Sequence, residues 1–275
     1  MKIARALVDH TPMWGLVDTD RGVVDLIAGP LRAWAPALTA DFSSTPPLAG
    51  RTVDLESVSL LLPVDPGSKV LAAGATYAKH IAGLGLKMPE KPAAFLKPYE
   101  SLIGPYDDII YPPITEQLDY EVELVVVVGA PTRRGDAGAA GILGYCVGND
   151  VSARDLQFGG AVTGMDIFSA KGLDDTSGIG PWIVTRDEIG AGDPDLALTL
   201  TVDGEVRQHD RTSSLVWGPA ELIEYVAARS RLSPGDVLFT GTPAGVAHED
   251  GRYLQKGQVV EATVEGLGTL RNTVR

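Results

Sequence analysis

The stretch LDYEVELVVVVG, Leu118 to Gly129, constrains the fold of this chain more than any other segment. Its run of leucine and valine is typical of a strand that is buried on both faces. Two glutamates, Glu121 and Glu123, stand immediately before this run. An unpaired charge at such a buried position costs several kcal/mol, so the two carboxylates need a partner of opposite charge.

A bound cation is one partner that this spacing allows. Side chains alternate between the faces of a strand, so Glu121 and Glu123 point the same way with their Cβ atoms about 7 Å apart. Hard carboxylate oxygens favour Mg²⁺, Mn²⁺ or Ca²⁺. The alternative for a lone E-x-E pattern is a solvated strand face, because glutamate is ordinarily exposed.

A third carboxylate occurs in a similar setting, in LGYCVGNDVSARDLQ. A short apolar segment ends at Asp150, and the S-x-x-D pattern of Ser152 and Asp155 predicts a capping box at the start of a helix. Asp150 is therefore expected at a strand-to-helix junction, where it could supply a third metal ligand. The alternative is a plain Asx turn.

The composition limits the class of protein. A chain of 275 residues is long enough for one large domain with a small accessory unit, and its 32 glycines and 19 prolines indicate many turns. Pro-rich and Ser-rich segments place a boundary near residue 65, between a small N-terminal domain (1–65) and a main domain (66–275). In the first domain, Asp20 to Gly22 is expected to turn a hairpin.

The charge and the cysteine content indicate the partners and the compartment. A net charge of −13 opposes binding to nucleic acid. The single cysteine cannot form an intrachain disulfide, the first residues lack the apolar stretch of a signal peptide, and no apolar run approaches 18 residues. We therefore expect a cytoplasmic protein with no membrane partner.

The pattern of the C-terminal part predicts half-buried antiparallel strands. LALTLTVDGEVRQH alternates apolar and polar residues and then turns at Asp203-Gly204, and VVEATVEG places Val260, Ala262 and Val264 on one face. The clearest helix is SSLVWGPAELIEYVAARSR, which carries an apolar stripe.

Four motifs together resemble the fumarylacetoacetate hydrolase family. They are DYEVELVVVVG, GYCVGNDVSARDLQ, SAKGLDDTSGIGPWIVT, and GDVLFTGTPAGV followed by YLQKGQVVEATVEGLG, in the same order and at similar spacing over about residues 70–275. The resemblance implies a β-rich mixed α/β fold, an FAH-type β-sandwich or β-roll with flanking helices. It also implies a homodimer.

The resemblance implies a role for individual residues as well. The family's metal ligands fall on Glu121, Glu123 and Asp150, with Mg²⁺ or Mn²⁺ expected and Ca²⁺ as a further possibility. Its lysine falls on Lys171, where it would hold a substrate carboxylate or an enolate oxygen. The positions expected to line the substrate pocket are Tyr77, Arg154, Gln157 and Thr242.

The sequence departs from the family in its lid segment. Many members carry a His-x-x-Glu pair there that activates water, whereas this chain has His80 followed by Gly83. His80 is expected to act as a base on its own, or with Glu90 swinging in from the same loop. Gly83 and Gly85 would suit closure of this loop over a substrate.

The leading functional hypothesis is a metal-dependent hydrolase acting on a small keto-acid substrate. It would cleave a C–C bond of a β-diketo acid of the acylpyruvate or fumarylpyruvate type, and the leaving carbanion would be held as a metal-bound enolate. The alternative is a decarboxylase, tautomerase or dehydratase that acts on an oxaloacetate-like or sugar-derived keto acid. A third hypothesis is a catalytically inactive metal-binding protein.

Overall fold

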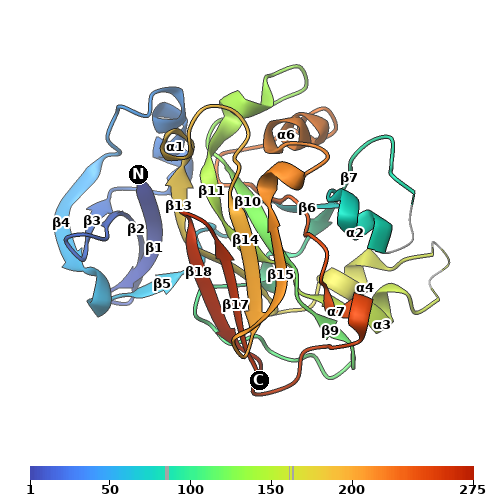
Figure 1. Ribbon diagram of the computed structural model, residues 1–275. Coiled ribbons are helices and arrows are strands. Elements are labelled where there is room, and N and C mark those ends of the chain that lie inside the picture. The colour runs from blue at the N-terminus through green and yellow to red at the C-terminus, as the bar shows by residue number, and fades with distance from the viewer. Residues whose placement is uncertain (84–86, 161, 163) are drawn as a thin grey trace.

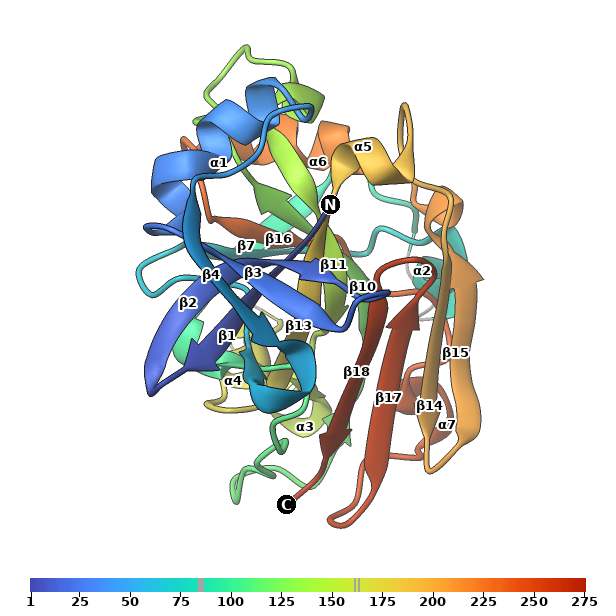
Figure 2. The same cartoon turned by 90° about the vertical axis from the view of Figure 1, so that its left-hand side faces the viewer.

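The computed structural model describes residues 1–83, 87–160, 162 and 164–275. Its largest element is a twelve-stranded sheet in the order β4-β3-β2-β1-β13-β11-β10-β16-β6-β7, with β5 paired to β1 and β8 paired to β13 (Figure 1). A four-stranded antiparallel sheet lies beside it (Figure 2). The β-rich, mixed α/β class predicted from the sequence is confirmed.

The larger sheet is mixed, because β6 and β16 are parallel, as are β8 and β13, while its other pairs are antiparallel. Its strands are β1 (Lys2–Val8), β2 (Thr11–Asp18), β3 (Val23–Ile27), β4 (Leu48–Asp54), β5 (Ser59–Leu61), β6 (Val70–Gly74), β7 (Ala93–Lys97), β8 (Leu102–Ile103), β10 (Val122–Val128), β11 (Ile142–Asn149), β13 (Ser177–Thr185) and β16 (Val237–Phe239).

The N-terminal strands continue this sheet. Strand β1 pairs with β13, with Lys2 opposite Val184. The predicted hairpin is present, since β2 and β3 pair across a turn that ends at Gly22, whose φ is +66°. Helix α1 (Leu31–Ala40) follows β3. The predicted boundary at residue 65 falls in the connection between β5 and β6.

Strand β10 is buried on both faces, as its valine run predicts. Its even-numbered residues, Val122 to Val128, belong to the apolar cluster that includes the second sheet. Val125 and Val127 lie in a second apolar cluster, together with Trp34 of α1. Glu121 and Glu123 precede these two valines on the odd-numbered side, so the carboxylates stand at the end of a fully buried strand.

The second sheet consists of β14 (Ala197–Val202), β15 (Glu205–Arg211), β17 (Val259–Val264) and β18 (Gly268–Thr273). The predicted turn at Asp203-Gly204 is confirmed, with positive φ at both residues (51° and 81°). The predicted alternation is also confirmed, because every second residue of β14 and β17 is buried. This sheet covers one face of β10.

The predicted C-terminal helix is confirmed but is shorter than its sequence pattern. Helix α6 (Pro219–Ala227) begins directly after Gly218 and has its proline in the first turn. The residues before it form a short 3₁₀ turn, η4 (Thr212–Ser214). No helix among the residues described above is long and apolar enough to cross a membrane.

Four short helices gather on one side of the molecule, at the right of Figure 1. They are α2 (Ala78–Gly83), α3 (Arg154–Gln157), α4 (Ile167–Lys171) and α7 (Ala247–Asp250), near the paired strands β9 (Leu118–Asp119) and β12 (Ser152–Ala153). The remaining elements are α5 (Arg186–Ile189), η1 (Leu55–Ser57), η2 (Tyr99–Ser101) and η3 (Gly138–Gly141).

The capping box predicted at α3 is wrong. Ser152 lies in β12 and its hydroxyl donates to the Asp150 carbonyl (3.1 Å), while the residue that caps α3 is Ala153. The Asp155 carboxylate accepts hydrogen bonds from Thr115 and from the backbone of Glu116 instead. The chain pairs as a short strand before it turns into the helix, which moves the helix start by one residue.

Candidate functional site

Three buried carboxylates meet at the end of β10: Glu121, Glu123 and Asp150. Their exposed fractions are 5%, 1% and 1%, and one oxygen of each lies within 4.8 Å of the others. The structure therefore brings together the three side chains that the sequence predicted as metal ligands. Three negative charges buried this closely require cations beside them.

Backbone hydrogen bonds hold the two strand ends that carry these carboxylates. The Asp150 amide donates to the Glu121 carbonyl (2.9 Å), and the Glu121 amide donates to the Asn149 side-chain oxygen (2.9 Å). In the ladder of β10 and β11, Val122 lies opposite Asn149. The relative position of Glu121 and Asp150 is thus set by sheet pairing.

Lys171, at the end of α4, bridges two of the carboxylates. Its Nζ donates to Glu121 Oε2 (2.7 Å) and to Asp150 Oδ2 (2.6 Å). Burial alone would lower the pKa of Lys171, but the two carboxylates outweigh this effect and raise it above its usual value. The ammonium group therefore stays charged, next to the predicted metal ligands.

Arg154 holds Glu121 from another side. Its guanidinium donates to Glu121, to Asp119 Oδ2 (2.7 Å) and to Gln157 Oε1 (2.8 Å). The bond to Gln157 shows that these two side chains lie on one face of α3. Burial opposes ionisation of Glu121, yet Lys171 and Arg154 lower its pKa to about 2.

Lys97, at the end of β7, contacts the third carboxylate, Asp150. Its side chain has no exposed surface, and its Nζ donates to Asp150 Oδ1 (2.6 Å), to the Lys171 carbonyl (2.6 Å) and to Ser177 Oγ (3.3 Å). Burial lowers the pKa of Lys97, and Asp150 opposes that shift. Asp150 thus lies between two ammonium groups, one at each oxygen.

Glu123 differs from its two neighbours because no cationic side chain of the described residues forms an ion pair with it. Its Oε2 accepts a hydrogen bond from the Gly241 amide (2.6 Å), in the loop after β16. Burial raises the pKa of Glu123 well above its usual value, and the charges of Asp150 and Glu121 raise it further. A cation at the triad would relieve this cost.

The three carboxylates fit a hard divalent cation. At Mg–O distances of about 2.1 Å, neighbouring ligand oxygens of one ion lie about 3 to 4 Å apart, so an arrangement within 4.8 Å needs only small side-chain rotations. All three donors are carboxylate oxygens, the ligand type of Mg²⁺, Mn²⁺ and Ca²⁺. Glu123, which lacks an ion-pair partner, would gain one.

His80 of α2 lies next to Glu249 of α7. Its Nδ1 lies 3.3 Å from Glu249 Oε1, and the His80 side chain is only 8% exposed. A β-carbon added at Gly83 would lie 3.2 Å from the same Oε1 atom. The Glu249 carboxylate therefore occupies the space next to Gly83, where the lid glutamate of the family would begin.

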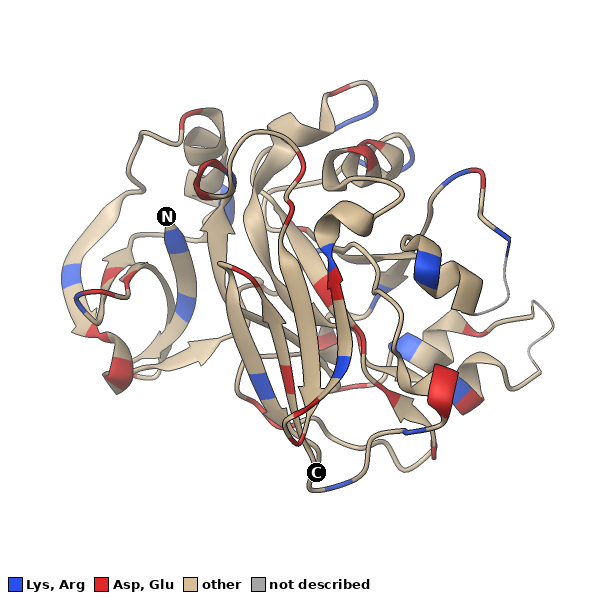
Figure 3. Cartoon of the chain, in the orientation of Figure 1, with Lys and Arg blue, Asp and Glu red and all other residues tan. Residues whose placement is uncertain are grey.

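Glu90, which the sequence offered as the partner of His80, is exposed in this structure. The carboxylate beside His80 instead comes from a segment 169 residues further along the chain. Figure 3 shows α7 in red because Glu249 and Asp250 lie in it. Gly85, the second glycine of the predicted lid, lies outside the described residues.

Asp119 fixes α7 against the site. Its carboxylate accepts hydrogen bonds from the amides of Ala247 (2.7 Å) and His248 (3.1 Å) and from Arg154 Nε (2.7 Å). Burial raises the pKa of Asp119, and Arg154 opposes the shift. The same Arg154 that contacts Glu121 is thus linked through Asp119 to the helix that carries Glu249.

The remaining predicted pocket residues are buried, with different surroundings. The Thr242 hydroxyl donates to the Val122 carbonyl (3.0 Å) and accepts from Gln208 Nε2 (2.9 Å), so it holds the start of β10. The Tyr77 hydroxyl has no hydrogen-bond partner among the described residues. Burial and the nearby Glu123 raise the pKa of Tyr77 above its usual value.

Four residues of the site have no role in the sequence analysis: Lys97, Asp119, Gln208 and Glu249. Lys97 could have been noticed in the sequence, because it ends the apolar strand AAFLK. The sequence around Asp119, Gln208 and Glu249 shows no such signal, and only their contacts in the structure reveal them.

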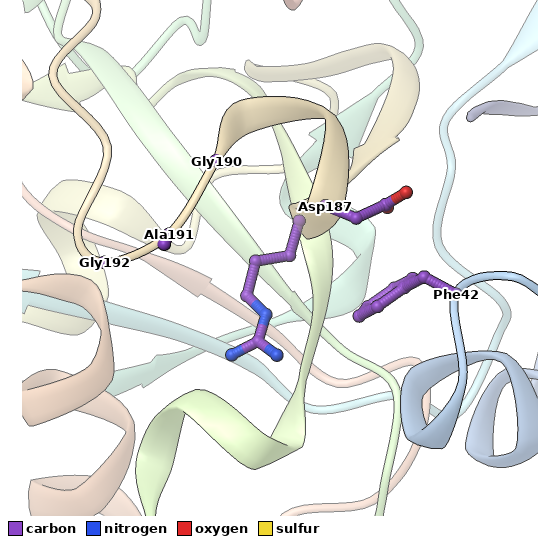
Figure 4. Close-up of a pocket in the computed structure, with 6 residues that line it drawn as sticks. Phe42, Asp187, Gly190, Ala191 and Gly192 are labelled. Atoms are coloured by element: carbon purple, nitrogen blue, oxygen red, sulfur yellow. The ribbon is translucent and has the colours of Figure 1, made fainter.

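A cavity of about 420 Å³ lies elsewhere, between α5 and the chain that follows α1 (Figure 4). Its lining includes Phe42, Arg186 and the glycine-flanked turn that begins at Gly190. The Arg186 guanidinium donates to the Ala139 carbonyl (2.6 Å). The carboxylate triad is not part of this lining, and we place the candidate chemistry at the triad because its three buried carboxylates converge there.

Comparison with known families decides the affiliation of the chain. The family described as fumarylacetoacetate (FAA) hydrolase, C-terminal, matches residues 69–275. The chain belongs to the fumarylacetoacetate hydrolase family. A second family, described as Rv2993c-like, N-terminal, matches residues 1–63.

Relatives within the family have different activities in their names. The 2,4-didehydro-3-deoxy-L-rhamnonate hydrolase of Sphingomonas sp. (strain SKA58) is 36% identical, over 94% of this chain and 91% of that protein. The solved 5-carboxymethyl-2-hydroxymuconate delta-isomerase from Mycobacterium smegmatis is also 36% identical, with a TM-score of 0.82, covering 100% of this chain and 99% of the other.

A second solved structure contains a metal ion. Fumarylpyruvate hydrolase from Pseudomonas aeruginosa, in complex with Mn²⁺ and pyruvate, is 30% identical with a TM-score of 0.69, covering 78% of this chain and 91% of that one. The family thus includes hydrolases and isomerases. Together with the buried carboxylate triad, this similarity indicates a metal-binding enzyme.

Proposed function

We propose that this protein is a divalent-metal-dependent hydrolase that cleaves a C–C bond in a small β-diketo acid of the acylpyruvate or fumarylpyruvate type. The observation that carries the proposal is the contact of His80 with Glu249 beside Gly83. Hydrolysis needs a base to activate water, and a carboxylate bonded to one imidazole nitrogen orients the other for that task. The fumarylpyruvate hydrolase relative supports the choice of substrate class.

In this proposal Glu121, Glu123 and Asp150 hold Mg²⁺ or Mn²⁺, which acts as a Lewis acid when bound. Lys171 stands next to the same carboxylates, so its ammonium group can balance negative charge on a substrate oxygen. Tyr77, whose buried hydroxyl is without a partner among the described residues, is available to donate to a ligand.

The proton transfers are assigned to His80. His80 Nε2 accepts a proton from water as the water oxygen bonds to the distal carbonyl carbon of the diketo acid. The C–C bond next to that carbon then breaks, and its electron pair passes to the pyruvate fragment as an enolate. The proton returns from His80 to the enolate carbon, which gives a carboxylic acid and a 2-keto acid.

The test is a rescue experiment on an acylpyruvate with Mn²⁺. We expect His80→Ala and Glu249→Ala each to lower hydrolysis by about 10² to 10⁴. Gly83→Glu in the Glu249→Ala background should restore most of the lost rate, because the two side chains share one space. Unchanged hydrolysis in Glu249→Ala would contradict the proposal.

Two matched variants serve as controls. Asp250→Ala removes a neighbouring carboxylate of α7 and should leave the rate unchanged, because the Asp250 carboxylate pairs with Arg252. Glu90→Gln tests the lid loop directly. A sharp loss in Glu90→Gln with no loss in Glu249→Ala would assign the role to Glu90 instead.

A second candidate function is tautomerisation or decarboxylation of an oxaloacetate-like acid, with dehydration of a sugar-derived keto acid as a related reaction. The isomerase among the structural relatives favours it. This chemistry requires the metal ion and Lys171 but no water-activating pair. Turnover of oxaloacetate that survives both His80→Ala and Glu249→Ala, with no cleavage of acylpyruvates by the unaltered enzyme, would select this candidate.

We also propose that the protein is a homodimer, as the family resemblance implies. Light scattering after size-exclusion chromatography tests this proposal, and a mass near the 28.9 kDa of one chain would contradict it.

A further inference from the structure

Lys97 contacts the triad through Asp150 and, among the described residues, through no other carboxylate. Its Nζ bonds Asp150 Oδ1, whereas Lys171 bonds Asp150 Oδ2 and also Glu121 Oε2. Lys171 therefore lies on the side of Asp150 that faces the other carboxylates, and Lys97 lies at the opposite oxygen. Among the described residues, Lys97 forms its only ion pair with Asp150.

The other two bonds of Lys97 complete its hydrogen-bonding capacity. One goes to the backbone carbonyl of Lys171 (2.6 Å) and the other to Ser177 Oγ (3.3 Å). An ammonium group has three hydrogens, so each of them has a buried acceptor. Lys97 thus fixes both a predicted metal ligand and the backbone of the residue predicted to contact substrate.

We propose that Lys97 is a positioning residue that holds Asp150 and Lys171 in the arrangement that binds the metal ion. The proposal rests on the metal site of the proposed function but not on its reaction. A divalent ion that joins Glu121, Glu123 and Asp150 competes with Lys171 for the same oxygens, while the bond of Lys97 to Asp150 Oδ1 can persist. Lys97 then orients the Asp150 carboxylate both in the metal-free protein and in the metal-bound protein.

A positioning role and simple electrostatics predict opposite changes in metal affinity when Lys97 is removed. Removing a positive charge near a bound cation should tighten metal binding by Coulomb's law. Removing the group that orients a ligand should weaken it, and partners of metal ligands typically contribute about 10- to 100-fold in affinity. We expect the second effect to dominate, because the buried Asp150 Oδ1 oxygen would lose the hydrogen bond from Lys97 that holds the carboxylate in its orientation.

The experiment measures Mn²⁺ affinity of the metal-stripped full chain by calorimetry and by electron paramagnetic resonance. Lys97→Met should weaken Mn²⁺ binding about 10- to 100-fold. Lys69→Met is the matched control, since Lys69 also pairs with a buried aspartate, Asp236, at a site remote from the triad. Its Mn²⁺ affinity should equal that of the unaltered protein.

Circular dichroism and thermal unfolding accompany each measurement, because a purely structural lysine would lower the melting temperature without changing the Mn²⁺ affinity of the folded protein. If Lys97→Met does not fold, Lys97→Gln replaces it. Unchanged or tighter Mn²⁺ binding in the folded variant would overturn the proposal.

A measurement on the unaltered protein provides a second test. In NMR spectra of ¹⁵N-labelled lysine ammonium groups, Mg²⁺ should shift the Lys171 signal and leave the Lys97 signal slowly exchanging with water. Loss of the Lys97 signal on Mg²⁺ binding would contradict the proposal. Neither measurement uses substrate, so failure of the hydrolase assignment would leave this result intact, and the reverse also holds.

Discussion

At the scale of single residues, the site is a balance of buried charges. Lys171, Arg154 and Lys97 compensate two of the three triad carboxylates through short hydrogen bonds, and Glu123 receives only a backbone amide. Burial therefore raises the pKa of Glu123 above its usual value. Glu123 is therefore the carboxylate that gains most from a metal ion.

We predict that Glu123→Gln abolishes Mn²⁺ binding and lowers metal-dependent turnover at least 100-fold, about the effect of losing one charge-stabilising group. The metal-free variant should be as stable as the unaltered protein or more stable, because a buried carboxylate has been neutralised. Thermal unfolding in EDTA measures this, with Glu261→Gln on β17 as a control for a half-buried glutamate. A strongly destabilised Glu123→Gln protein would disagree with this description.

His248 shows how neighbouring residues affect a titration. Its ring stacks on Phe158, with centroids 5.1 Å apart, and its Nδ1 lies 3.2 Å from the Tyr253 hydroxyl. Burial lowers the pKa of His248 from 6.5, and the charge of Arg154 lowers it further. Of the other groups that face this ring, His80 also lowers the pKa, whereas the carboxylates Asp119 and Glu249 oppose the shift.

We predict that NMR titration places the pKa of His248 below 6.5. Because the folded pKa lies below the unfolded value, the contribution of neutral His248 to stability is complete above pH 6.5 and is lost as pH falls through the folded pKa. Phe158→Ser should expose the ring and raise the pKa. A pKa at or above 6.5 in the unaltered protein would contradict this prediction.

At the scale of elements, β10 connects the core to the chemistry. One face of the strand packs against the second sheet, and its second residue, Glu123, belongs to the carboxylate triad. Helix α7 has only four residues, so the side chain of Asp119 fixes its position by accepting from two of its amides. Strand pairing thus orders the ligands, and single side chains order the short helices.

We predict that Leu124→Ala, in the middle of β10, lowers the free energy of unfolding by about 2 to 5 kcal/mol, because Leu124 is fully buried. Urea denaturation measures the change. Leu96→Ala is the matched control in β7, where the leucine is 65% exposed, and it should change the free energy of unfolding by less than about 0.5 kcal/mol. Equal losses in the two variants would contradict the assignment of the core.

At the scale of the whole molecule, the two sheets and the short helices meet at the triad. The triad carboxylates come from the start of β10, with the residue before it, and from the residue after β11. The lysines come from β7 and α4, and the proposed water-activating pair comes from α2 and α7. We therefore expect binding of one ion to be coupled to the packing of several distant segments of the chain.

We predict that metal removal lowers the melting temperature of the whole protein and that Mn²⁺ or Mg²⁺ restores it. An ion present at 100 times its dissociation constant stabilises the folded state by about 2.7 kcal/mol. Scanning calorimetry with EDTA and with graded Mn²⁺ tests this, and the Glu123→Gln variant should show no response to metal. A melting temperature that is independent of metal would argue against a site in the folded core.

The sequence by itself predicted several of the strands and the three carboxylates that the structure brings together. Alternation along β14 and β17, the Asp203-Gly204 turn and the valine run of β10 are local patterns, because side-chain period and turn chemistry depend on neighbours in the chain. The E-x-E pair and Asp150 were found in the same way. The capping box at Ser152 failed because pairing of β12 with β9 outweighed a local preference.

Only the tertiary structure decided which side chains support these ligands. Glu249 lies beside His80 across 169 residues, and Lys97 reaches Asp150 across 53. No periodicity links such positions, because their approach depends on how β6, β7 and α7 are placed around the central strands. Gly83 has no side chain, and the Glu249 carboxylate of α7 lies in the space beside it. Protein interiors are closely packed, so the segment that the fold brings next to a glycine fills the space that a side chain would take.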